Sequence, residues 1–182
     1  MLDISWRFDR WFEGLPASPA DRGRVHRCIV RTGPGQRATP DSVDLIEGQG
    51  VAGDSWRTHP HSRAGNQVSL INVHVIRSLA DGDESCTPLS GDNLQVDLDL
   101  GEANLPVGTL LEIGTAVLRV SPDPHRPCRS FAARYGKAAV KKVARATRIG
   151  RRGRGVLCEV VTGGTIRVGD AILVRRRVPP ER

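Results

Sequence analysis

Aromatic residues are scarce in this chain, and it has no long apolar run. Aromatics make up 4% of the 182 residues, so a core must be built mainly from Val, Leu, Ile and Ala. No apolar stretch approaches the length of a membrane-spanning helix, which argues against an integral helical membrane protein. Charges at Asp3, Arg7 and Asp9 interrupt any apolar core of a secretory leader. We therefore expect a cytoplasmic protein with no membrane partner.

The cysteines also lack a familiar metal-binding pattern. There are four, and no two of them form a CxxC pair, so a structural zinc site is not expected. A cytoplasmic location predicts reduced thiols. Cys28 and Cys158 lie in strand-like patterns and are expected in the core, whereas Cys86 lies in a polar loop.

Glycine and proline are abundant, with 20 and 12 residues, which favours short strands and tight turns. The length fits one domain with an appendage. We expect a β-barrel with helices over residues 73–79, capped by Asn72, and over 131–147, broken near Gly136. Turns at Gly163-Gly164 and Gly169-Asp170 predict hairpins. The expected strands cover residues 25–30, 44–46, 67–71, 94–100, 110–113, 116–120, 155–161, 165–168 and 171–175.

The first 22 residues differ from the rest in composition. Four of the seven aromatics lie there, at Trp6, Phe8, Trp11 and Phe12. We expect an N-terminal extension at 1–22 that packs on a barrel domain at 23–178, followed by a tail at 179–182.

Cys128 is the strongest candidate for chemistry. It follows an apolar strand pattern, precedes a helical one, and has Arg126 and Arg129 on either side. Neighbouring cations and a helix N-terminus both stabilise a thiolate, which is the nucleophilic and metal-binding form. The alternative is that Cys128 is simply a small apolar residue.

Positive charge is concentrated in one part of the chain. The net charge is +7, and residues 137–154 carry eight Lys or Arg without a single Asp or Glu. Such a run fits a phosphate, a nucleic acid, an anionic surface or an acidic protein partner, although many basic faces are only solvated.

Seven short segments, in this order, resemble the MOSC family, named after the C-terminal domain of molybdenum-cofactor sulfurase. They span about residues 25–175. The segments are Gly50-Val51-Ala52-Gly53-Asp54, Gln67-Val68-Ser69-Leu70-Ile71, Gly91-Asp92-Asn93-Leu94, Leu105-Pro106-Val107-Gly108, Ile113-Gly114-Thr115-Ala116-Val117-Leu118, Pro127-Cys128 and Gly164-Thr165-Ile166-Arg167-Val168-Gly169-Asp170.

The resemblance implies a mainly β protein, a barrel of the MOSC and pyruvate-kinase-barrel type, with a few short helices. It also implies a molybdenum cofactor, Mo-molybdopterin, with Cys128 on the metal. Family members reduce N-hydroxylated small molecules with electrons from a partner redox protein, and others are proposed sulfur carriers. Two positions differ from the family pattern. Asp92 stands where Glu is frequent, and Ser130 stands where a basic residue is frequent.

The candidate site residues have different proposed roles. A soft metal prefers a deprotonated thiolate, which Cys128 would supply as catalytic residue and metal ligand. The turn at Gly91 and the amide of Asn93 would face the cofactor, with Ser69 and Asp54 as further contacts. Asn93 and Asp54 could instead brace their own turns. Arg126 and Arg129 would supply positive charge, and His59 and His61 in the polar loop 55–66 are weaker candidates for proton donation.

Three functions compete. The first is a molybdenum enzyme that reduces N-hydroxylated substrates through Cys128. The second is a sulfur or cofactor carrier that holds a Cys128 persulfide. The third, nucleic-acid binding by residues 137–154, is not favoured, because only Tyr135 is close enough to offer a base-stacking ring.

Overall fold

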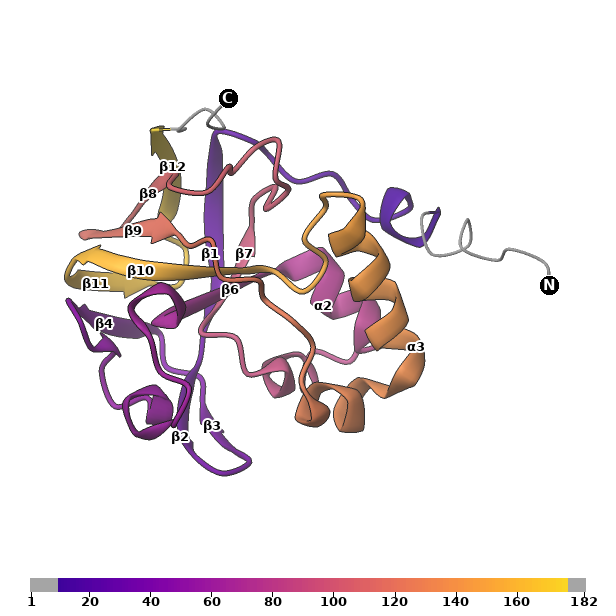
Figure 1. Cartoon of the computed structure of the whole chain (residues 1–182), viewed down its shortest axis with the longest axis horizontal. Coiled ribbons are helices and arrows are strands. Elements are labelled where there is room, and N and C mark those ends of the chain that lie inside the picture. The colour runs from indigo at the N-terminus through magenta and orange to yellow at the C-terminus, as the bar shows by residue number, and fades with distance from the viewer. Residues whose placement is uncertain (1–9, 177–182) are drawn as a thin grey trace.

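The computed structural model describes residues 10–176, and a closed barrel of β-strands forms its larger part (Figure 1). Around the barrel the strand order is β1-β12-β8-β9-β10-β6-β7. Neighbouring strands are antiparallel except for β6 and β7, which pair in parallel. The bounds are β1 (Arg22–Cys28), β6 (Val68–Asn72), β7 (Leu94–Asp97), β8 (Leu110–Ile113), β9 (Ala116–Val120), β10 (Val156–Thr162) and β12 (Ala171–Arg176).

Alternation of apolar and polar residues explains why these segments form a barrel. In β1, Gly23 and Val25 are buried while Arg22 and Arg24 are exposed, as the period of two in a strand requires. A register shift between Val25 and Arg27 then turns Cys28 inward as well. Strands β9 and β10 alternate in the same way. Their inward side chains form one apolar core of Val, Leu, Ile and two cysteines, which confirms the barrel and the aliphatic core expected from the sequence.

Smaller strand pairs extend the barrel at one end. β2 (Val30–Gly33) and β3 (Gln36–Ala38) form a hairpin that projects from the barrel (Figure 1). The sequence predicts only a loop over most of that segment. β4 (Ser42–Ile46) pairs with both β5 (Gly50–Val51) and β11 (Gly164–Arg167).

This pairing contradicts the hairpins expected at Gly163-Gly164 and Gly169-Asp170. β11 does not pair with β10, which precedes it along the chain, or with β12, which follows it, but with β4. The glycines therefore mark points where the chain leaves the barrel and returns to it. The sequence locates the three strands well but assigns them the wrong neighbours.

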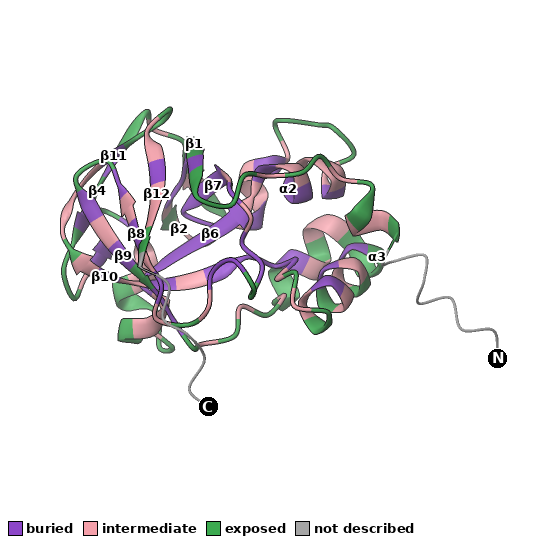
Figure 2. Cartoon of the chain, turned by 90° about the horizontal axis from the view of Figure 1, so that it is seen from above, coloured by how far each residue is buried: buried purple, intermediate pink, exposed green. Residues whose placement is uncertain are grey.

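Two helices cover one side of the barrel (Figures 1 and 2). α2 (Val73–Leu79) begins at Asn72, whose side chain accepts hydrogen bonds from the backbone of His74 and Val75, as predicted. α3 (Arg129–Arg148) is interrupted at Gly136, where φ is 80°, as expected from the break in its pattern. Figure 2 shows that the outer face of α3 is largely exposed.

A second, smaller apolar cluster joins α2, α3 and the start of the described chain. It contains Ile71, Ile76 and Phe131, with Trp11 and Phe12 packed against it. This agrees with an N-terminal segment that packs on the domain. Trp6, Phe8 and the predicted tail at 179–182 lie outside the described residues. Within 10–176, no helix is long and apolar enough to cross a membrane.

Two short helical turns lie in the polar segment 55–66, which the sequence predicts to be an irregular loop. They are η1 (Ser55–Thr58) and η2 (Ala64–Asn66). A third, η3 (Thr87–Ser90), precedes the turn at Gly91 and ends there, with Gly91 in the left-handed conformation. These turns and the hairpin β2–β3 lie around the candidate site described below.

Candidate functional site

Cys128 lies at the N-terminal end of α3 and is exposed. Its backbone is extended, with φ −91° and ψ 173°, and its carbonyl accepts the first hydrogen bond of the helix, from Ala132, at 3.0 Å. Its side chain does not cap the helix by a hydrogen bond. The thiol is thus reachable from solvent at the positive end of a helix dipole, an arrangement that suits a thiolate.

Two arginines of the β2–β3 hairpin place positive charge near Cys128. Arg31 and Arg37 are direct partners across the hairpin. The pKa of Arg37 is lowered, first by burial and then by the like charges of Arg134 and Arg31, while Cys128 acts on it in the opposite direction. Arg37 and Cys128 therefore lie within electrostatic range of each other. We call Arg31, Arg37 and Arg134 the arginine cluster.

The arginine cluster has more positive charge than its carboxylate partners neutralise. Arg31 pairs with Asp54, with Nη2 and Oδ1 2.8 Å apart. Within the described chain, neither Arg37 nor Arg134 forms an ion pair with a carboxylate; they donate instead to the carbonyls of Gly35 and Leu89. The Nε of Arg37 is buried and has no hydrogen-bond partner. Crowded like charges and an unsatisfied donor both favour an anionic ligand.

Gly91 allows the hairpin to approach this point closely. Its φ is +77°, which L side chains rarely adopt, and a Cβ built there would lie 3.2 Å from the Nη2 of Arg37. Because Gly91 has no Cβ, the guanidinium of Arg37 can lie against the turn.

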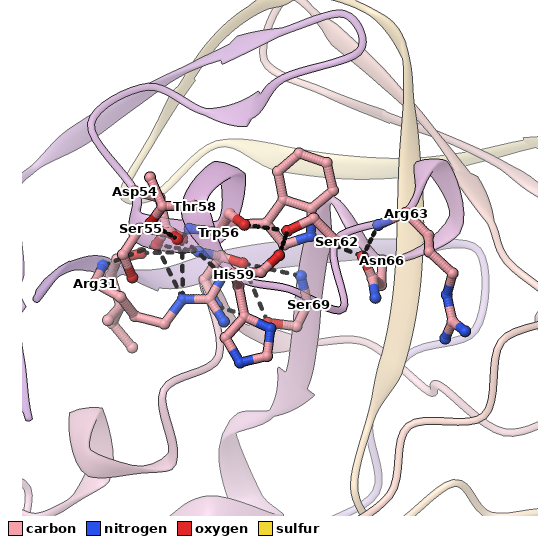
Figure 3. A network of polar contacts seen from close by, with 12 residues as sticks. Arg31, Asp54, Ser55, Trp56, Thr58, His59, Ser62, Arg63, Asn66 and Ser69 are labelled. Atoms are coloured by element: carbon pink, nitrogen blue, oxygen red, sulfur yellow. Dashed lines mark hydrogen bonds and ion pairs between the residues drawn. The ribbon is translucent and has the colours of Figure 1, made fainter. Parts of the chain in front are cut away.

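Asn93, Ser69 and Asp54 do come together, but as a buried network (Figure 3). The Oδ1 of Asn93 accepts hydrogen bonds from the Ser69 backbone N–H and hydroxyl, both at 3.1 Å. Its Nδ2 donates to Asp54 Oδ2 at 3.1 Å. Since Asn93 is only 1% exposed and its amide is occupied, it braces the turn after Gly91.

Asp54 has no free oxygen to offer a ligand. Its carboxylate accepts hydrogen bonds from the backbone N–H, the Nε and the Nη2 of Arg31. It also accepts one from the Trp56 backbone N–H at 2.8 Å and one from the Asn93 Nδ2. Figure 3 shows Arg31 and Asp54 facing each other beside Trp56. This geometry favours a structural role for Asp54 over cofactor binding, since the residue orients Arg31 and caps η1.

The remaining predicted residues lie at the surface. Arg126 and Arg129 are exposed on either side of Cys128, as their sequence position suggests. His59 and His61 are also exposed, with the ring of His59 accepting a bond from the His61 backbone at 3.2 Å. No interaction connects these histidines to Cys128, so their role as proton donors stays a prediction.

The other three cysteines have environments that suppress reactivity. Burial raises the pKa of Cys28 to about 11 and that of Cys158 to about 12, and both lie in the barrel core, as predicted. A hydrogen bond to Asp83 raises the pKa of the half-exposed Cys86. Cys128 is the one fully exposed cysteine of the described chain.

A cavity of about 840 Å³ lies next to this segment, and Cys128 is not among its lining residues. The lining includes Pro122 and His125, from the stretch that leads to the cysteine, and Arg152. Among residues 10–176, no group of three or more His, Cys, Asp or Glu side chains could hold a metal ion.

Sequence reasoning missed Arg31, Arg37 and Arg134. A signal for two of them was present, because Gly33-Pro34-Gly35 reads as a tight turn and a hairpin through it pairs Arg31 with Arg37. Arg134 gave no comparable signal, since its position near the site depends on the packing of α3 against η3.

Comparison with known proteins identifies relatives of the chain. The model of the MOSC domain family matches residues 53–173. No curated protein sequence matches. Among solved structures, the YuaD protein of Bacillus subtilis superposes with a TM-score of 0.60 at 18% identity, covering 83% of this chain and 94% of that one. YiiM from Escherichia coli gives 0.57 at 19% identity, covering 85% and 71%, and YiiM from Geobacillus stearothermophilus gives 0.56 at 16%, covering 87% and 77%. At these identities the similarity supports the fold alone.

Proposed function

The chain belongs to the MOSC domain family, and from this membership and the geometry around Cys128 we propose that it binds the molybdenum cofactor and reduces N-hydroxylated small molecules. The observation that carries the proposal is an exposed cysteine at a helix N-terminus, within electrostatic range of a partly buried arginine whose Nε lacks a partner. A soft ligand and an anion site thus lie close together, which is the combination that a metal-dithiolene cofactor with a phosphate requires.

The residues present fit this cofactor. Cys128 offers one thiolate sulfur, and the pterin dithiolene would supply the other soft donors. Arg37 and Arg134, which have no carboxylate partner, would hold the phosphate. The absence of a side chain at Gly91 lets Arg37 lie against the turn. The buried residues Asn93, Ser69 and Asp54 would not contact the cofactor. They would hold the Gly91 turn and the Arg31 side chain in place.

The proposed reaction is a two-electron reduction. An N-hydroxylated compound takes up two electrons and two protons, its N–O bond breaks, and the amine or amidine leaves with one water molecule. When bound, the molybdenum cofactor supplies the redox centre for this step, and a partner redox protein supplies the electrons. The chain's own residues hold the site: Cys128 offers its sulfur, the arginine cluster balances anionic charge, and exposed His59 or His61 would deliver protons from solvent.

An activity assay tests the proposal. The protein, expressed in a host that makes the cofactor, is supplied with an artificial low-potential electron donor and an N-hydroxylated amidine, and formation of the amidine is followed. We expect turnover by the wild type and a loss of at least about a hundredfold in Cys128→Ser, as for other residues that contact the reacting centre. Cys86→Ser is the matched control and should keep wild-type turnover. Equal activity in Cys128→Ser and the wild type would reject the role of Cys128.

A sulfur-carrier function is the second candidate, and the exposure of Cys128 supports it as well. A persulfide forms when the thiolate takes a sulfur atom from a donor persulfide, which leaves as its thiolate. Arg37 would stabilise the resulting anion. A mass increase of one sulfur atom on the Cys128 peptide, lost on reduction, together with no turnover in the assay above, would favour the carrier.

A further inference from the structure

A buried ion pair lies behind the Gly91 turn, between Asp92 and Arg154. The Nη1 of Arg154 is 2.7 Å from both carboxylate oxygens of Asp92, and its Nη2 donates to the Ser90 carbonyl at 3.3 Å. The side chains are 0% and 5% exposed. Arg154 comes from the loop between α3 and β10, so the pair connects that loop to the turn after η3.

The same pair contacts the Cys128 segment on both sides of the cysteine. Three residues before it, the Nε2 of His125 is 3.6 Å from Asp92 Oδ1. Three residues after it, the guanidinium of Arg154 lies 4.7 Å from the ring centroid of Phe131, which is fully buried. Both ends of the stretch from His125 to Phe131 therefore pack against the Asp92–Arg154 pair.

The neighbours of Asp92 in sequence connect this pair to the rest of the site. Gly91 lies against Arg37, and Asn93 is fixed by Ser69 and Asp54. The turn thus has a fixed relation to the arginine cluster on one side and to the Cys128 segment on the other. Buried ion pairs add little net stability compared with apolar residues of the same volume, and in several proteins they specify a unique arrangement.

We propose that Asp92 and Arg154 are positioning residues that hold Cys128 in a fixed orientation facing the arginine cluster. The purpose of that orientation rests on the proposed cofactor function, but the orientation itself is measurable without cofactor or turnover. Neither residue contacts the reacting atoms; both act through His125, Phe131 and the Gly91 turn.

The test measures the rate at which iodoacetamide alkylates Cys128 in a Cys86→Ser background, under conditions where each variant is folded by circular dichroism. Asp92→Asn removes the charge and keeps the shape, so Cys128 loses its fixed position and its rate changes. We expect a fall of about fivefold or more, because Cys128 would no longer face the cations that favour its thiolate. Asp92→Glu keeps the carboxylate and should retain the rate within about threefold. An unchanged rate in folded Asp92→Asn, or an equal fall in Asp92→Glu, would overturn the proposal.

A second variant covers the case in which Asp92→Asn does not fold. The double change Asp92→Leu with Arg154→Met replaces both charges by apolar groups, which commonly preserves folding. We expect this protein to be folded and to show the same slowed alkylation. A folded double variant with the wild-type rate would show that the pair has only a structural role.

Molybdenum content separates this proposal from the proposed function. A wild-type protein that fails to bind molybdenum, with Asp92→Asn still slow in alkylation, would remove the cofactor and leave the positioning role intact. If the wild type binds molybdenum and Asp92→Asn leaves the alkylation rate of Cys128 unchanged, the positioning role is refuted and cofactor binding is supported.

Discussion

Cys128, Arg37 and Asp92 are the residues on which the proposed chemistry of this site depends. The sequence predicts the position of Cys128 well, because strand, loop and helix signals around it are local. It does not predict Arg37 as a neighbour, since that contact joins the β2–β3 hairpin to the start of α3. The flanking Arg126 and Arg129, which the sequence favours, are exposed, whereas the cation that interacts with the cysteine comes from another element.

The family resemblance predicts that Asn93, Ser69 and Asp54 lie together as cofactor contacts, and their burial favours a bracing role instead. The family resemblance brings them together, and the structure does join them by hydrogen bonds. All three are buried, so they hold the turn and the Arg31 side chain in place. Burial depends on the whole barrel, and no local pattern in the sequence reports it.

Alkylation should distinguish the cysteines. We expect the first adduct formed by iodoacetamide near neutral pH to lie on Cys128, because burial raises the pKa of Cys28 and Cys158 and Asp83 raises that of Cys86. Peptide mapping by mass spectrometry at partial modification identifies the site. A first adduct on Cys86 would contradict the assignment.

The stability of the protein should depend on His125 in acid. Burial lowers the pKa of His125 to about 3, with Arg154 acting in the same direction and Asp92 against it. Below about pH 6.5 the unfolded chain binds a proton on His125 that the folded chain does not. The free energy of unfolding therefore decreases as the pH is lowered from about 6.5 to about 3. Between about pH 7 and about pH 5 the loss attributable to His125 should reach about 2 kcal/mol.

Urea unfolding at the two pH values measures this effect. His125→Asn cannot titrate in this range and should show a smaller decrease than the wild type. His59→Asn, at an exposed histidine, is the matched control and should follow the wild type. A His125→Asn protein with the full wild-type decrease would locate the acid sensitivity elsewhere.

At the scale of elements, the helices follow their local signals and the C-terminal strands do not. Asn72 caps α2 and Gly136 breaks α3, and both are read directly from the sequence. The turns at Gly163-Gly164 and Gly169-Asp170 predict hairpins, but β11 pairs with β4, more than a hundred residues away in sequence. A turn signal specifies where the chain bends and not which strand lies beside it.

The cap of α2 gives a prediction at this scale. Asn72→Ala removes the acceptor for the backbone of His74 and Val75 and the donor to Ser18 and Leu98. We expect a loss of about 1–2 kcal/mol in the free energy of unfolding by urea. Asn72→Asp keeps the acceptor and should lose less; an equal loss in both would show that the amide donor, and not the cap, stabilises this point.

For the whole molecule, the uneven distribution of charge is the feature that bears on a possible docking surface. The eight Lys and Arg of residues 137–154 lie on α3 and the loop after it, and the outer face of that helix is exposed (Figure 2). Cys128 begins the short first segment of α3, and the break at Gly136 separates that segment from these basic residues. We propose that an acidic electron-transfer protein docks on the second segment of α3, beside the proposed redox site.

Charge reversal tests the docking. Lys137→Glu with Lys141→Glu changes two exposed side chains and spares Lys142, which lies over Trp11. We expect turnover with a protein donor to fall several-fold, and more at low salt, while turnover with an artificial donor is unchanged. Arg22→Glu with Arg24→Glu, on β1, is the control. Equal losses with both donors would refute docking on α3.

The molybdenum content of the purified protein decides whether Cys128 binds the cofactor. The wild type and the Cys86→Ala and Cys128→Ala variants are expressed in a cofactor-competent host, and molybdenum is measured by elemental analysis against protein concentration. We expect close to one molybdenum per chain in the wild type and in Cys86→Ala, and a large loss in folded Cys128→Ala. A folded wild-type protein without molybdenum, or equal loading in Cys128→Ala, would contradict this expectation.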